Sequence, residues 1–174
     1  MTGRVTPVLS TERLTLGPCT MAHVEAFTAF AATEASRFLG GPTDDPEDGW
    51  FSAGTHAGQW IIRGYGTFWL SDRTTGAPVG RLGPWHPGWA PEPDLSWVVY
   101  PAHEGKGLAL EAARAVLDWM ARETDLAAPA SFIAPENTRS IALARRLGAT
   151  EERRATSRKG EEAIVFRHVY GGAA

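Results

Sequence analysis

The chain has 174 residues, of which 43% are hydrophobic and 21% charged, values typical of a globular domain. A domain of this length buries about two thirds of the surface that its unfolded chain exposes, so it needs neither a disulfide nor a metal to fold. The formal net charge of −3 excludes the basic character that general nucleic-acid binding requires.

The single cysteine, Cys19, is compatible with a reducing compartment and cannot build a tetrahedral thiolate site. No apolar run approaches the ~20 residues that span a bilayer, and the N-terminus lacks the apolar core of a secretory signal. We therefore expect one cytoplasmic domain over residues 1–174, with no metal, nucleic-acid or membrane partner.

The first half of the chain predicts a strand, two helices and two strands. Apolar and polar residues alternate over 11–17, which indicates a strand. Apolar residues then recur about every three positions from the N-cap candidate Thr20 to the glycines at 40–41, as in a helix. Acids and a proline near residue 45 predict the start of a second helix, which runs to about residue 62. Two strands follow around a turn, at residues 67–70 and 79–82.

The second half predicts a loop rich in Pro, Trp and Gly, a buried strand, an amphipathic helix, a short strand, another helix and two closing strands. Their residues are 84–93, 95–100, 108–122, 131–134, 137–147, 151–157 and 163–170. Gly148 has the position of a helix C′ residue, and Lys159-Gly160 that of a turn. The order β-α-α-β-β-β-α-β-α-β-β indicates a mixed α/β (α+β) domain.

The segment from Trp97 to Ala109 is the most informative one, because it runs from a buried strand through a glycine turn directly into a helix. The first turn of a helix has unpaired N–H groups and a partial positive charge, and Gly105 and Gly107 give the backbone clearance around an anion. This pattern predicts a phosphate-binding loop. The alternative is a glycine turn that serves only packing. A dinucleotide fold would place such a turn after its first strand, and a P-loop would carry Gly-Lys-Ser or Gly-Lys-Thr.

Four motifs, in order along the chain, resemble those of the GNAT acetyltransferase superfamily, particularly its ribosomal-protein N-acetyltransferase (RimJ/RimL-type) branch. The segment 101–112 is similar to the coenzyme A signature Arg/Gln-x-x-Gly-x-Gly/Ala. The segments 11–14, 94–97 and 137–140 resemble the opening strand, the Glu-Leu-Gly-Tyr strand and the Asn-x-x-Ser helix of that branch. The resemblance implies the GNAT fold, a mixed and mostly antiparallel sheet flanked by helices.

The resemblance also implies an N-acetyltransferase that uses acetyl-coenzyme A as cosubstrate and acetylates a primary amine, on a protein N-terminus or a small molecule, by direct attack. The amine must lose a proton, and Asp94 is the candidate base; alternatively it is a solvated acid at the start of a strand. Ser140 is the candidate that protonates or steadies the departing thiolate, or else a local cap. The implied cofactor-binding residues are Trp97, Val98, Val99, Glu104, Gly105, Lys106, Gly107, Leu108, Ala109 and Asn137.

Several of these residues have a second interpretation. The strand residues 97–99 would pair with pantetheine through their backbone, while their side chains are ordinary core. Asn137 either hydrogen-bonds the pantetheine arm or caps its helix. Glu104 departs from the signature and puts an anion near the expected pyrophosphate, which Lys106 and the helix dipole would offset.

Ala144 stands where many relatives carry a tyrosine that donates a proton to the thiolate. The rival hypothesis is therefore a coenzyme A-binding module without transferase activity. An aromatic loop that contains His86, together with several tryptophans, is a further candidate wall of an acceptor site; the alternative is core or the surface of a possible homodimer. The tryptophans concerned are Trp50, Trp60, Trp85 and Trp89.

Overall fold

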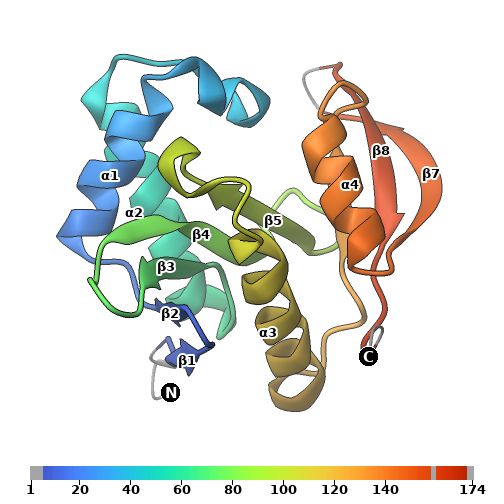
Figure 1. Cartoon of the computed structure of the whole chain (residues 1–174). Helices are drawn as coiled ribbons and strands as arrows, with labels where there is room; N and C mark the ends of the chain where they lie inside the picture. The colour runs from blue at the N-terminus through green and yellow to red at the C-terminus, as the bar shows by residue number, and fades with distance from the viewer. Residues whose placement is uncertain (1–5, 158–159, 172–174) are drawn as a thin grey trace.

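The computed structural model describes residues 6–157 and 160–171, which form an eight-stranded sheet with helices on both faces (Figure 1). The strand order is β1-β2-β3-β4-β5-β6-β8-β7. All neighbouring strands are antiparallel except β5 and β6, which are parallel. The mixed, mostly antiparallel sheet expected from the sequence is confirmed.

The elements have the following bounds. The strands are β1 Leu9–Ser10, β2 Leu14–Gly17, β3 Phe68–Asp72, β4 Pro78–Trp85, β5 Asp94–Val99, β6 Ala130–Ile133, β7 Thr150–Thr156 and β8 Glu162–Arg167. The α-helices are α1 Met21–Ala31, α2 Pro46–Arg63, α3 Leu108–Glu123 and α4 Thr138–Arg146. Two 3₁₀ helices, η1 Glu34–Leu39 and η2 Pro101–His103, lie between them.

Local chemistry explains where the helices begin and end. The side chain of Asp45 caps α2 by accepting a hydrogen bond from the N–H of Glu47, 2.9 Å away, and Pro46 occupies the first turn. Helix α4 ends at Arg146, and after the cap residue Leu147 comes Gly148, whose φ of 78° lies in the left-handed region that a C′ glycine adopts.

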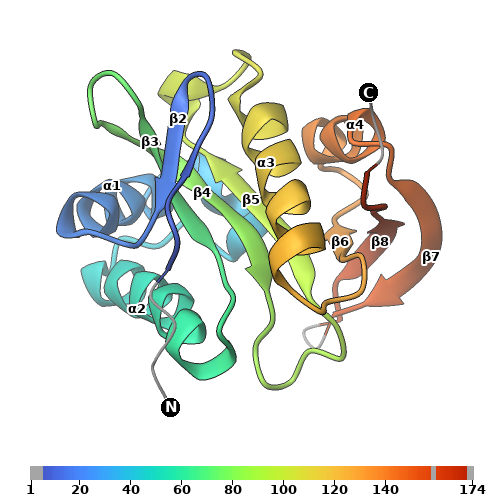
Figure 2. The ribbon, with the colours of Figure 1, turned by 90° about the horizontal axis from the view of Figure 1, so that it is seen from below.

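The helices form two layers around the sheet, as Figure 2 shows from below. Helix α1 lies on one face, where Phe27 and Phe30 pack against Trp69 and Val98. Helix α3 covers the opposite face and buries residues such as Val116 among the strand leucines. Helix α4 adjoins α3 and packs on β6 and β8. Alternate residues of β5 therefore face α1 or α3.

The first predicted strand and the first predicted helix differ from the structure. Residues 11–13 form a bend that separates β2 from β1, and β1 is too short to give an alternating pattern. The predicted helix breaks after α1, because the hydroxyl of Ser36 donates to the carbonyls of Ala31 and Thr33, at 2.9 and 2.8 Å. Such side-chain bonds compete with helical ones.

One residue predicted in a loop lies in a strand, and one predicted turn is only partly described by the structure. Trp85, which we expected in a loop, is the last residue of β4, because β4 continues to pair with β5 as far as Trp85↔Asp94. The predicted turn at Lys159-Gly160 falls partly on residues 158–159, which lie outside the described residues.

Candidate active site

Strands β5 and β6 part immediately after they meet, and side chains hold the point of separation. Their only register pair is Asp94↔Ala130. Beyond it, the hydroxyl of Ser131 donates to the carbonyl of Leu95 at 2.7 Å, and the Asp94 carboxylate accepts from the N–H of Phe132 at 3.2 Å. Side chains thus take the place of the backbone ladder, and the two strands open into a V.

A histidine completes this junction. His168 Nε2 lies 2.8 Å from Ser131 Oγ, and the single hydrogen of that hydroxyl is already donated to Leu95. His168 therefore donates from Nε2. The ring is fully buried, and this burial lowers its pKa to about 4. The base of the V is consequently an uncharged, hydrogen-bonded link between β5, β6 and the end of β8.

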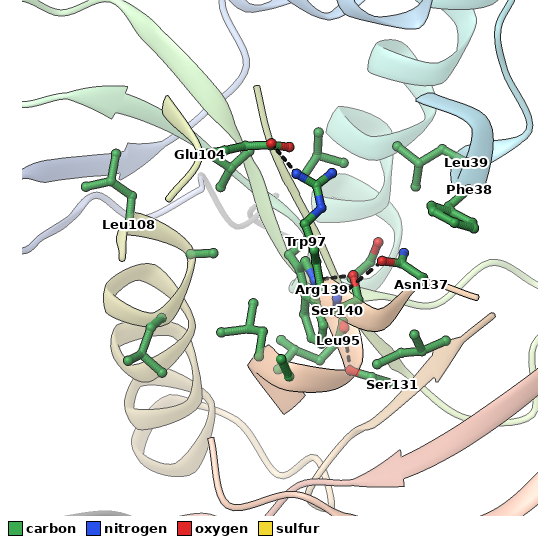
Figure 3. A pocket seen from close by; sticks show the side chains of 18 of the residues that line it. Phe38, Leu39, Leu95, Trp97, Glu104, Leu108, Ser131, Asn137, Arg139 and Ser140 are labelled. Carbon is green, nitrogen blue, oxygen red and sulfur yellow. Dashed lines mark hydrogen bonds and ion pairs between the residues drawn. The ribbon is translucent and has the colours of Figure 1, made fainter. Parts of the chain in front are cut away.

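A pocket of about 490 Å³ passes through the V (Figure 3). On the α3 face it is bounded by the loop before α3 and by the first turns of α3 and α4, and on the α1 face by α1 and η1. It brings together eleven of the residues singled out from the sequence: Asp94, Trp97, Val98, Val99, Glu104, Gly105, Gly107, Leu108, Ala109, Asn137 and Ser140.

The glycine turn is held against α3 by a residue that sequence reasoning did not single out. Gly105 and Gly107 have φ of 73° and 78°, so each needs the conformational freedom of glycine. Arg13 donates from Nη1 to the carbonyl of Lys106 at 2.8 Å, and its Nε donates to Glu111 in the first turn of α3 at 2.7 Å. The turn is therefore fixed with the start of α3 beside the pocket.

Glu104 and Lys106 do not have the partners that we expected from the sequence. Lys106 is exposed, does not line the pocket, and donates from Nζ to the carbonyl of Ala102 at 2.8 Å. Glu104 is paired instead with Arg139 of α4 (Figure 3). Arg139, rather than Lys106, neutralises Glu104, the acidic residue that departs from the signature.

Three side chains form a chain of contacts on the α4 wall. The Asn137 side chain accepts from the N–H of Ser140 at 3.2 Å, so it caps α4 while it lines the pocket. The indole N–H of Trp97 donates to Ser140 Oγ at 3.1 Å. Because an indole nitrogen only donates, Ser140 accepts here and its own hydrogen is left for another acceptor.

Asp94 is the acid on the α1 face of the V. Burial raises its pKa to about 7, against the opposing effects of the Phe132 N–H and of Arg81. Arg81 is only 4% exposed, and neither Nε nor Nη1 has a hydrogen-bond partner. A carboxyl group with a pKa near neutrality, in a pocket, is suited to accept a proton at physiological pH.

Comparison with known proteins decides the family. The sequence profile of the acetyltransferase (GNAT) domain matches residues 13–150. The chain belongs to the GNAT acetyltransferase family. The fold and the resemblance recognised from the sequence motifs are thereby confirmed.

Solved GNAT structures agree with this assignment. An acetyltransferase from Agrobacterium tumefaciens is 36% identical, with 94% of each chain covered and a TM-score of 0.85. A putative GNAT-family acetyltransferase from Bordetella pertussis is 27% identical over 94% of this chain and 99% of its own, with a TM-score of 0.78. RimL, a ribosomal α-N-protein acetyltransferase solved in complex with coenzyme A, shares the fold at 14% identity, with 96% and 100% covered and a TM-score of 0.76.

Several other candidates lie away from the pocket of this GNAT chain. His86 contacts the hydroxyl of Tyr65 and the carbonyl of Ala90. Trp60 is core, and the ring of Trp85 contacts that of His56 in a tilted arrangement, with 4.1 Å between ring centroids. Neither His86 nor any of the four tryptophans named from the sequence lines the pocket.

Position 144 does not face the pocket either. Ala144 is fully buried and packs between α4 and the sheet, beside residues such as Ile133 and Phe166. The alanine therefore leaves no gap in the pocket wall, because position 144 contributes no side chain to that wall.

The described part of the chain holds neither a candidate metal site nor a helix that could span a membrane. Within residues 6–157 and 160–171, no three His, Cys, Asp or Glu side chains gather into a possible metal site. None of the helices described there combines the length and the apolar character needed to cross a membrane.

Proposed function

We propose that this protein is an acetyl-coenzyme A-dependent N-acetyltransferase that acetylates a primary amine by direct attack. The observation that carries the proposal is the continuous pocket, which leads from the glycine turn at the start of α3, through the V between β5 and β6, to the Asp94 carboxylate. Such a path would connect a phosphate-binding helix start with a proton acceptor.

The residues on the α3 face fit coenzyme A. The N–H groups of residues 105–109 would bind the pyrophosphate, because the start of α3 offers unpaired donors and a partial positive charge, whereas the N–H of Glu104 already donates to the carbonyl of Pro101 at 3.3 Å. Beyond Asp94, β5 has no ladder partner in β6, so the backbone of Trp97, Val98 and Val99 would pair with the amides of the pantetheine arm. Asn137 lies on the opposite wall and would contact the same arm.

The chemistry then falls to residues at the V. Acetyl-coenzyme A supplies an acetyl group on a thioester; the amine nitrogen bonds to the acetyl carbon as the carbon–sulfur bond breaks. Asp94 accepts the proton that the amine loses, directly or through water. Trp97 holds the hydroxyl oxygen of Ser140, and the hydrogen of that hydroxyl would protonate or steady the departing sulfur.

Cofactor binding is tested by Gly107→Asp, which adds a charged side chain where phosphate approaches and should abolish coenzyme A binding in calorimetry. The matched control is Gly76→Asp: Gly76 has a similar φ of 74° in the turn between β3 and β4. The control carries the same backbone strain and should bind as wild type. Equal, unchanged affinity in both folded variants would remove the cofactor assignment.

Transferase activity is tested by incubating the protein with acetyl-coenzyme A and a panel of amines. The panel holds N-terminal peptides, polyamines, aminoglycosides, free amino acids and simple alkyl and aryl amines. Acetylation of at least one amine supports the proposal. Coenzyme A binding without transfer to any member, and without slow hydrolysis of the thioester, would instead favour the rival binding module.

A further inference from the structure

The pocket continues past the V on the α1 face, where most of its wall is apolar. We propose that this acceptor half binds a small primary amine whose single amino group is carried by an apolar, preferably aromatic, group; the proposal rests on the transferase function above. The acceptor half is lined by Phe30, Ala35, Phe38, Leu39, Asp94, Ser96 and Val98.

The acceptor half is separate from the surface that faces the glycine turn. Val98 packs with Phe27 and Phe30 of α1, whereas its neighbours Trp97 and Val99 pack with the core beneath α3. Since successive residues of a strand point to opposite faces, Asp94 and Ser96 belong to the α1 face with Val98. The V is the passage between the two halves.

Most of the wall on this side is apolar. Phe30 is nearly buried, Phe38 is partly buried, and Leu39 is 44% exposed at the end of η1. Two phenyl rings on adjacent elements can take an aromatic group edge to face or in offset stacking, which stabilises it beyond what area burial alone provides. An apolar group on the acceptor would cover these side chains.

Charge limits the acceptor to one amino group. Among the described residues that line the pocket, Asp94 is the only ionisable one in the acceptor half; His103, Glu104, Arg139 and Arg146 belong to the loop before α3 and to α4. Arg81 lies behind it on the same face, opposite Val98 in the register, and its buried cation repels further positive charge. A second ammonium group would have no carboxylate partner, and burying an unpaired charge costs several kcal/mol. This disfavours polyamines and aminoglycosides.

Polar groups are equally scarce for a peptide. Of the residues that the structure describes in the acceptor half, Ser96 is the only other one with a polar side chain. A peptide N-terminus would bring N–H and C=O groups next to Phe30, Phe38 and Leu39, and each group that stays unpaired there weakens binding. The wall therefore favours a small amine over a polypeptide.

The first test compares kcat/KM for 2-phenylethylamine, propylamine, spermidine, kanamycin and a hexapeptide with a free N-terminus. We expect 2-phenylethylamine to exceed each of the others at least tenfold. Preference for spermidine, kanamycin or the peptide would overturn the inference while leaving the transferase function intact.

The second test uses Phe38→Ala, with Phe51→Ala as the matched control. Phe51 is 64% exposed on α2 and does not line the pocket. Phe38→Ala should raise KM for 2-phenylethylamine at least fivefold and leave KM for propylamine and acetyl-coenzyme A within twofold. The control should change none of them. Equal losses for both amines would contradict the inference.

A binding measurement separates this inference from the proposed function. Calorimetry of wild-type protein saturated with coenzyme A should detect binding of 2-phenylethylamine, weakened at least fivefold in Phe38→Ala, whether or not acetyl transfer occurs. Failure of the amine to bind would overturn the inference. Failure of coenzyme A to bind in the preceding titration would overturn the proposed function.

Discussion

Arg139, at the start of α4, forms an ion pair with Glu104 in the loop before α3, and the pair joins the two walls of the pocket (Figure 3). The Glu104 carboxylate pairs with the Arg139 guanidinium, which would otherwise be free to attract a pyrophosphate at the neighbouring N–H groups. Both side chains are accessible to solvent, so the competition is screened by water and salt.

Glu104→Gln should therefore strengthen coenzyme A binding modestly, because Arg139 becomes free to contact the phosphates. The gain should stay below about 1 kcal/mol, which is up to about fivefold in Kd, as for other exposed charges. Calorimetry at two salt concentrations should show the gain shrinking at the higher one. A large loss of affinity would mean that Glu104 itself contacts the cofactor.

Arg139→Ala should weaken coenzyme A binding severalfold, because it leaves the Glu104 carboxylate unpaired beside the expected phosphates. Pantetheine, which has no diphosphate, should bind this variant as it binds wild type. Arg145→Ala is the matched control, because Arg145 is exposed on the same helix and does not line the pocket. Equal losses of coenzyme A affinity in the two arginine variants would show that the effect comes from net charge alone.

Ser140→Ala should lower kcat by about tenfold and change the affinity for coenzyme A little, if its hydroxyl contacts the departing sulfur. Trp97→Phe removes the indole donor that holds Ser140 Oγ, and should produce a smaller loss. In a double-mutant cycle the effect of Trp97→Phe should largely vanish in the Ser140→Ala background. Additive losses would show that Trp97 acts through packing alone.

The elements of the fold that depend on local sequence were predictable. The acids and Pro46 at the start of α2 and the glycine after α4 carry their signals within a few residues. The break between α1 and η1 was missed because an unbroken apolar period outweighed the hydroxyls of Thr33 and Ser36, whose backbone contacts compete with the helix.

The parts of the site that sequence reasoning missed are long-range pairings. Arg13 and Glu111 are 98 residues apart, and Ser131 and His168 are 37 apart. Neither pair has a periodic or motif signal, since only the sheet topology brings the two partners together. Arg139 lies inside a recognised motif, yet its partner depends on how α4 approaches the glycine turn.

His168 should make the protein less stable in acid. Its pKa is about 4 in the folded protein and about 6.5 in the unfolded chain, so between these values the unfolded chain binds more protons. This contribution to the free energy of unfolding is present above pH 6.5 and is lost as pH falls toward 4, by up to about 3 kcal/mol. Urea unfolding of His168→Gln between pH 4 and 7 should show a shallower dependence than wild type. Parallel curves would contradict the assignment.

Asp94→Asn should lower turnover by ~10²-fold or more near neutral pH, the usual effect of removing a positioned base, with nearly unchanged coenzyme A affinity. Because the pKa of Asp94 is about 7, the wild-type rate should rise with pH through that value. Toward pH 10 more of the amine is already neutral, so the deficit of the variant should shrink. A pH–rate profile of both proteins measures this.

Stability separates a catalytic role of Asp94 from a structural one. Its pKa rises from 3.8 to about 7 on folding, so between these values the folded protein binds more protons and its stability falls as pH rises. Asn cannot ionise and its amide oxygen can still accept from Phe132, so above pH 7 the variant should be more stable than wild type, by on the order of 1 kcal/mol or more. Glu92→Gln is the contrasting control: its carboxylate pairs with Arg153 and Arg167, so its loss should reduce stability and spare turnover. If the Asp94→Asn protein is both slower and less stable than wild type, the carboxylate only holds the strands together. If the variant is slower but more stable, the fold tolerates a destabilising buried acid because the reaction needs it.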